Sequence, residues 1–224
     1  MVSNAMNELQ REGSLEAAVS GALTAPGLDD LAAEYAELGL DGFMDDSIVA
    51  ELPVAKTILS VVRVGVGIRN RLFARKLLDF LSGFRGVSEW ERRDMVSRIE
   101  ADPGYGRRVG EHLTELLERI ETIKKPRMVA TIFRAYAENS IDVNMLHRLN
   151  HCVERIPVYA IAEVRHFATR KTEKLGSQSR IVGTARVMDF VNAGLVDIGS
   201  AIGGLTYVPN DVCQEFVSLD LDKT

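Results

Sequence analysis

Cysteine is scarce in this sequence, which has only Cys152 and Cys213 among its 224 residues. Two thiols do not make a disulfide framework, and their small number suits a reducing compartment. Histidine is also rare, and the best metal candidate is the pair His147 and His151, which a helix would place on one face. A zinc protease needs Glu directly after the first His, but Arg148 stands there. The sequence therefore predicts no metal site and no cofactor.

Long apolar runs are absent as well. The most apolar stretch, residues 48–68, is interrupted by Glu51, Pro53, Lys56 and Arg63, whereas a membrane-spanning helix needs about 20 largely uncharged residues. Charged residues also come before any apolar run at the start of the chain, so no signal peptide is predicted. We therefore expect a cytoplasmic protein without a transmembrane segment.

Catalytic motifs are missing too. Residues 65–70 read Gly-Val-Gly-Ile-Arg-Asn and approach the dinucleotide-binding fingerprint, but Asn70 replaces the third glycine and no strand precedes them. Serine, histidine and aspartate are scattered, with no nucleophile-elbow sequence around any serine. We therefore expect no catalytic residues and a protein that is not an enzyme.

Basic residues are almost absent from the first 53 positions, which have eleven acids and one base and thus a net charge of −10. The rest of the chain has 26 bases and 21 acids, a net charge of +5. Such an acidic segment can be a solvated or loosely helical tail, or it can fold back on the basic body. We favour the first interpretation because runs of charge are usually solvated. Residues 1–27, rich in Gly, Ser and Ala, are predicted to be weakly ordered.

What the sequence does contain is helical periodicity, and it predicts a mainly α fold. A stripe in residues 53–84 includes Phe73, Leu77 and Phe80, while Gly65 and Gly67 suggest a bend or a close helix approach. Ser88 and Glu91 have the spacing of a capping box, which predicts a helix start. We expect a helical domain over residues 28–139 and a second module over residues 140–224. The other helices are expected at 28–40, 109–123, from Pro126 to Tyr136 and from Ser140 to Ile156, with Asp102 as a cap and a break at Pro157.

The C-terminal module has a different pattern. Residues 181–193 are predicted to be a helix, residues 194–208 a β-hairpin around a Gly-rich turn, and residues 211–219 a closing helix. With "NAGLVDIG" and "GLTYVP" around the turn, this order resembles the second half of a winged-helix domain. The resemblance implies a recognition helix followed by a two-stranded wing, and winged helices serve both DNA binding and protein docking.

A second resemblance covers residues 48–156. The segments "LPVAKTILSVVRVGVGIRNRLFARKLLDFL", "SEWERRDMV" and "IFRAYAENSIDVNMLHRLNH" are similar to a family of bacterial hypothetical proteins with no assigned activity. That resemblance implies a bacterial, cytoplasmic origin and no particular chemistry.

Two groups of basic residues are candidate binding sites. Residues 165–186 have six bases and one acid, and cations at the start of a recognition helix could neutralise phosphates while a polar side chain such as Asn192 approaches bases. The candidate nucleic-acid-binding residues are Arg170, Lys171, Lys174, Arg180, Thr184 and Arg186. A basic strip within residues 53–84, which is either an anion-binding surface or simply a solvated polar face, consists of Arg63, Arg69, Arg71, Arg75 and Lys76.

Three hypotheses follow. The first is a non-enzymatic protein that acts through macromolecular contacts, with DNA as a possible partner of the winged-helix-like module. The second, which we rank below the first, is a defence or toxin-type effector whose 53–84 helix acts on membranes. The third is a structural homo-oligomer assembled through the apolar side of the same helix.

Overall fold

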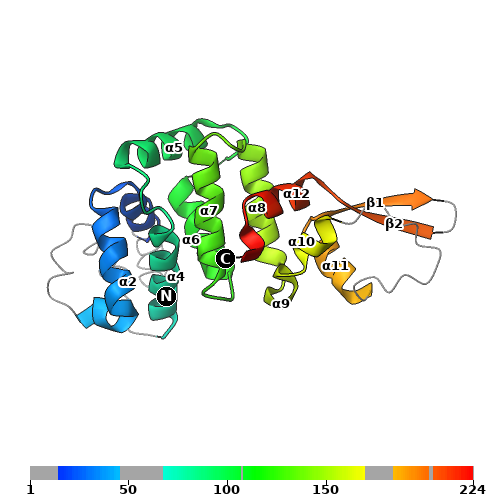
Figure 1. The fold of residues 1–224 in the computed structure, drawn as a ribbon. Coiled ribbons are helices and arrows are strands. Elements are labelled where there is room, and N and C mark those ends of the chain that lie inside the picture. Colours follow the sequence, from blue (N-terminus) through cyan, green and yellow to red (C-terminus); the bar gives the residue numbers. More distant parts are fainter. Residues whose placement is uncertain (1–14, 46–67, 107, 170–183, 202–203, 224) are drawn as a thin grey trace, which may run out of the picture. The chain divides into compact units, whose positions relative to one another are not determined.

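The computed structural model describes residues 15–45, 68–106, 108–169, 184–201 and 204–223. These residues are mainly helical, with one two-stranded antiparallel sheet near the C-terminus (Figure 1). The predicted fold class, mainly α with a short hairpin, is therefore confirmed. The chain divides into two compact units, residues 1–143 and residues 144–224. The sequence placed its boundary four residues earlier, after residue 139.

The first unit begins with a helix over residues 15–24, in which Val19, Ala22 and Leu23 are completely buried. The prediction of weak order is therefore wrong for this stretch, because its small and apolar residues recur at helical spacing and pack inward. Residues 1–14 lie outside the described part of the chain.

Helix α2, Leu28–Asp45, also buries apolar residues that recur at helical spacing. Leu28, Leu31 and Tyr35 are buried, as their spacing predicts, and the helix is kinked at Gly39, where φ is +66°. Residues 15–45 thus pack into the first unit instead of forming a solvated tail. Asp29, Asp30 and Glu37 are exposed, and Glu16 and Glu34 are half-buried, so the segment folds back through its apolar residues.

Helix α4, Ile68–Ser82, is the described part of the predicted 53–84 helix. Its stripe of Phe73, Leu77, Phe80 and Leu81 is buried as predicted, but Ala74, Lys76, Leu78 and Asp79 are buried too. The prediction of a solvated polar face is therefore wrong for residues 73–81, where only Arg75 is exposed. The helix is enclosed because α2, α6 and α7 all pack on it.

The remaining helices of the first unit confirm most local predictions. Ser88 caps α5 with the expected capping box: its Oγ accepts from the Glu91 amide at 3.2 Å, and Glu91 Oε2 accepts from the Ser88 amide at 2.8 Å. Ile123, expected on the buried face of the 109–123 helix, lies beyond its end and is 39% exposed. Asp102 ends α5 instead of starting the next helix. Helix α5 spans Glu89–Ala101, α6 spans Val109–Arg119 and α7 spans Lys125–Ala137.

Gly83, just after α4, marks a close approach between segments. A Cβ atom at this position would lie 2.4 Å from the Cβ of Ala130 in α7. The backbone here therefore has no room for a side chain, and this contact lets α7 pack closely against the end of α4.

The second unit is built from short helices and the hairpin. Its helices are α8 (Val143–Arg155), α9 (Val158–Ile161), α10 (Val164–Ala168), α11 (Thr184–Asn192), α12 (Asp211–Ser218) and the 3-10 helix η2 (Leu221–Lys223). Its strands are β1 (Val196–Ala201) and β2 (Gly204–Pro209). The helix predicted at 181–193 is present from Thr184, the predicted hairpin and closing helix are present too, and α9 starts directly after Pro157 as expected. Helix α8 begins at Val143, so Ser140 is too early to be its N-cap.

The base of the hairpin is tied to both neighbouring helices. Phe167 of α10 and Phe190 of α11 pack with ring centroids 5.0 Å apart. Asn210 caps α12 by accepting from the Cys213 amide at 3.1 Å, and its own Nδ2 donates to the Gly194 carbonyl at 2.9 Å. The polypeptide thus enters and leaves the hairpin at one fixed place, and the strands extend away from the helices of this unit (Figure 1).

Candidate interaction surfaces

The basic strip predicted on residues 53–84 is not one continuous surface. Arg71 and Arg75 are exposed, but Lys76 is only 5% exposed. Its Nζ donates to the carbonyls of Leu117 at 2.9 Å and Glu118 at 3.5 Å. Arg63 lies outside the described residues, and for Arg69 only the position in the first turn of α4 is described. The assignment of Lys76 to a solvated or anion-binding strip is therefore wrong.

The acceptors of Lys76 explain its burial. Leu117 and Glu118 belong to the last turn of α6, where carbonyls lack partners within the helix and the helix dipole is negative. The ammonium group of Lys76 satisfies them, while burial lowers its pKa. Lys76 is thus a structural cation that joins α4 to the end of α6.

Arg92 does the same for the helix over residues 15–24. Its guanidinium, 3% exposed, donates to the carbonyls of Leu23 at 2.8 Å and Ala25 at 2.7 Å, and also to the carbonyl of Val87. Two of these acceptors lie at the C-terminal end of that helix. A planar group with several fixed donors suits three converging carbonyls.

Two further arginines repeat this arrangement at the surface of the first unit. Arg98 donates to the carbonyls of Ala137 at 3.1 Å and Tyr136 at 3.5 Å, at the end of α7. Arg134 donates to the carbonyl of Gly83 at 3.0 Å, just after α4. Four basic side chains of this unit therefore act on helix C-termini, which accounts for part of the positive charge of the body.

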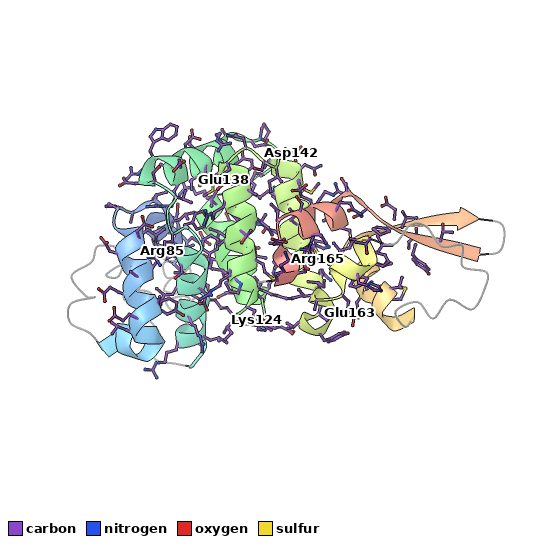
Figure 2. The ribbon with its side chains drawn as sticks, in the orientation of Figure 1. Arg85, Lys124, Glu138, Asp142, Glu163 and Arg165 are labelled. Carbon is purple, nitrogen blue, oxygen red and sulfur yellow. The ribbon has the colours of Figure 1, made fainter. Side chains whose placement is uncertain are left out.

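In the second unit, Arg165 is also engaged within the protein. It was counted in the basic stretch 165–186, but its side chain binds Asp222 through two hydrogen bonds of 2.6 and 2.7 Å and Asp220 through one of 2.6 Å. It also donates to the carbonyl of Val217 at 3.2 Å, in the last turn of α12 (Figure 2). Arg165 therefore holds α10 to the end of α12, and it is a poor candidate for binding phosphate.

Arg148 is engaged in a similar way. It donates from both terminal nitrogens to Asp211, the first residue of α12, at 2.5 Å each. This hydrogen bonding lowers the pKa of Asp211. Among the described residues, no group of three or more His, Cys, Asp or Glu side chains that could hold a metal ion is found, either at the neighbouring His147 and His151 or elsewhere.

Of the candidate nucleic-acid-binding residues, Arg170, Lys171, Lys174 and Arg180 lie outside the described part of the chain. Thr184 and Arg186 belong to the first turn of α11. Met188 lies four residues after Thr184 and Asn192 lies eight residues after it, and the side chains of both Met188 and Asn192 are exposed. The position expected for a recognition helix therefore has an exposed face that includes Asn192, the polar residue singled out from the sequence.

Sequence reasoning missed an exposed apolar group beside that face. Tyr159 is 65% exposed, and its hydroxyl donates to Asp189 of α11 at 2.9 Å. Its neighbour Val158 and Met188 of α11 are exposed as well. The signal was weak, because Tyr159 and Asp189 lie on separate short helices that only the fold brings together.

Among the described residues of the first unit, Asp79 is a buried carboxylate. Asp79 of α4 accepts from the Tyr35 hydroxyl at 3.4 Å and lies 3.6 Å from the guanidinium of Arg127. Burial raises the pKa of Asp79, and burial together with this carboxylate raises the pKa of Tyr35 to about 12. Tyr35, Asp79 and Arg127 thus join α2, α4 and α7, so this contact belongs to the packing of the unit's core.

The membrane hypothesis and the helix-mediated oligomer hypothesis both require an exposed apolar face on residues 53–84. The part of this stretch that the structure describes, α4, buries its apolar face inside the first unit. Among the described residues, no helix is both long and apolar enough to cross a membrane.

Comparisons of this protein with models of known protein families, with curated proteins and with solved structures find no match. The similarity to winged helices and to bacterial hypothetical proteins therefore stays a prediction from sequence motifs.

Proposed function

We propose that this protein acts through macromolecular contact without catalysis, and that its C-terminal unit binds DNA. The observation that carries the proposal is the cationic entry to α11. Residues 170–186 contain five bases and one acid, and they lead directly into the first turns of this helix. Phosphate backbones are bound by such clusters of Lys and Arg.

The charge balance of the unit supports this location. Outside residues 170–186, the unit contains four bases and eight acids, so its net charge there is −4, against +4 within the stretch. Three of those four bases, Arg148, Arg165 and Lys223, are paired with carboxylates. A polyanion would therefore approach the unit at the entry to α11.

The exposed face of α11 suits base contact. Asn192 can donate to and accept from adenine in the major groove, and Met188 can pack on a thymine methyl group. The winged-helix-like order of α11, hairpin and α12 is consistent with presenting this helix to a groove.

A fluorescence-anisotropy titration of a duplex DNA with the full chain tests the proposal. We expect salt-sensitive binding, and we expect Arg180→Ala combined with Arg186→Ala to weaken it and to reduce the salt slope by about 2, because two phosphates are then no longer neutralised. The control is Arg71→Ala combined with Arg108→Ala, which removes the same charge from exposed positions of the first unit. Absence of binding at low salt by the parent protein would overturn the proposal.

A second candidate function is docking of another protein on the exposed apolar group formed by Val158, Tyr159 and Met188. Exposed Tyr and Met side chains are common anchors of protein interfaces. Asp189 beside them also disfavours phosphate at this particular place. Met188→Glu should then lower the affinity for the partner while the helical content stays unchanged, whereas a Met188→Leu control should preserve it.

A further inference from the structure

The hairpin, residues 196–209, has a single charged residue, Asp197. Between Asp197 and Asp211 no residue is charged. Exposed strands in natural proteins are usually protected by charged side chains, proline or bulges. Here such protection is limited to Asp197 and Pro209, both at the base of the hairpin.

The pairing register places the apolar residues together. Ile198 faces Tyr207 across the strands, and Val196 faces Pro209, so these four residues share one side of the hairpin. The other side has the pair Asp197 and Val208 and, further out, the pair Gly199 and Thr206. A Cβ atom at Gly199 would lie 2.8 Å from Thr206 Oγ1, which shows that this pair is in close contact.

Exposure increases along the apolar side. Val196, at the base, is 8% exposed, whereas Ile198 is 53% exposed and Tyr207 is half-buried. Within the described residues each strand has a single neighbour, and the hairpin extends away from the helices of its unit (Figure 1). A two-stranded hairpin is only marginally stable in water unless its apolar side packs on something.

We propose that this apolar side packs against the same side of a second copy of the chain, so that the protein is a homodimer joined through its hairpins. The lack of charge on this side of the hairpin is the reason for choosing a second copy as its partner. In a two-fold contact the same surface of both copies meets itself, so an apolar surface without charge incurs no like-charge repulsion. Asp197 does not disturb the contact, because it lies on the other side of the hairpin.

A nucleic acid is the less suitable occupant of the hairpin. Insertion into a groove requires cations that compensate phosphate charge, and residues 196–209 contain no Lys or Arg. The dimer contact thus goes beyond the proposed DNA binding, and it would present two copies of α11 to two half-sites.

Sedimentation-velocity centrifugation of the full chain over a range of concentrations tests the proposal. We expect a dimer for the parent protein and a monomer for Ile198→Lys. The control Thr206→Lys puts the same charge on the opposite side of the hairpin and should stay dimeric. Circular dichroism of each variant verifies that its helices are intact.

A mixing experiment separates a broken interface from a misfolded hairpin. Ile198→Lys and Ile198→Glu should each be monomeric alone, and a mixture should form a heterodimer because the two introduced charges attract. A parent protein that stays monomeric at every concentration, or a dimer that Ile198→Lys does not dissociate, would overturn the proposal. The DNA titration distinguishes the two ideas, since a dimer without DNA binding refutes only the DNA proposal, and a DNA-binding monomer only the hairpin contact.

Discussion

The two units differ in the basic side chains that hold their helices together, although exposed arginine–carboxylate pairs such as Arg93–Glu89 also occur in the first unit. In the first unit four of them donate to backbone carbonyls at helix C-termini, and two of these, Lys76 and Arg92, are almost completely buried. In the second unit Arg148 and Arg165 donate mainly to carboxylates, with about 40% of each arginine side chain exposed. A carbonyl does not titrate and a buried contact is poorly screened, whereas an exposed ion pair responds to acid and salt.

This difference bears on the interpretation of the net charge of the body. The excess of bases after residue 53 suggested a surface for an anionic partner. Several of those bases instead hold helices together, so the part of the excess that is open to a partner is smaller than the sequence indicates. The contrast between the units predicts a ranked set of effects.

The largest effect is expected for Arg92→Met. The substitution keeps much of the aliphatic volume but leaves the carbonyls of Leu23, Ala25 and Val87 without their donor, and we expect a loss of about 3 kcal/mol in the free energy of unfolding. Urea denaturation followed by circular dichroism measures it. The matched control is Arg93→Met, which removes an exposed i,i+4 pair with Glu89 and should cost at most about 0.5 kcal/mol.

A smaller effect is expected for Lys76→Met. Methionine matches the stem of lysine, so the loss reflects mainly the two carbonyls of α6, and we expect about 2 kcal/mol. Arg75→Met, at the exposed neighbouring position, is the control. If Lys76→Met were no more destabilising than Arg75→Met, a structural role for the buried ammonium would be wrong.

The smallest effect is expected from acid, and it should separate the units. The pKa values of Asp211 and Asp220 lie below the ordinary 3.8 because of their hydrogen bonds to Arg148 and to Lys223 and Arg165. These carboxylates stabilise the fold above that pH, and their contribution is lost as the pH falls through the lowered pKa values.

Asp79 in the first unit behaves in the opposite sense. Burial raises its pKa, so its protonation on acidification favours the folded state. Hydrogen exchange followed by mass spectrometry below pH 4 should therefore show the second unit opening before the first. Simultaneous opening of both units, or earlier opening of the first, would contradict the comparison.

Local features of this fold were predictable because the signals that specify them lie close together in the chain. Ser88 and Glu91 form the expected capping box, and the strands on either side of the Gly-rich segment pair as the expected hairpin. Such features need only a few neighbouring residues to satisfy their own backbone groups.

The burial of Lys76 and Arg92 was not predictable in this way. A cation among apolar residues suggests a solvated position unless the end of another helix is known to lie opposite it. Those ends belong to α6 and to residues 15–24, which are 41 and 69 residues away in the sequence. The exposed group around Tyr159 was missed for the same reason, since its partner Asp189 is 30 residues away.

The binding of Arg92 to three backbone carbonyls also has a consequence for sequence divergence. Every residue presents the same carbonyl, so the side chains at positions 23, 25 and 87 can change without removing the acceptors, whereas position 92 has to keep its guanidinium. Among homologues we therefore expect position 92 to keep its arginine while the residues at positions 23, 25 and 87 vary. Covariation between these positions would be weak even though the hydrogen bonds are direct.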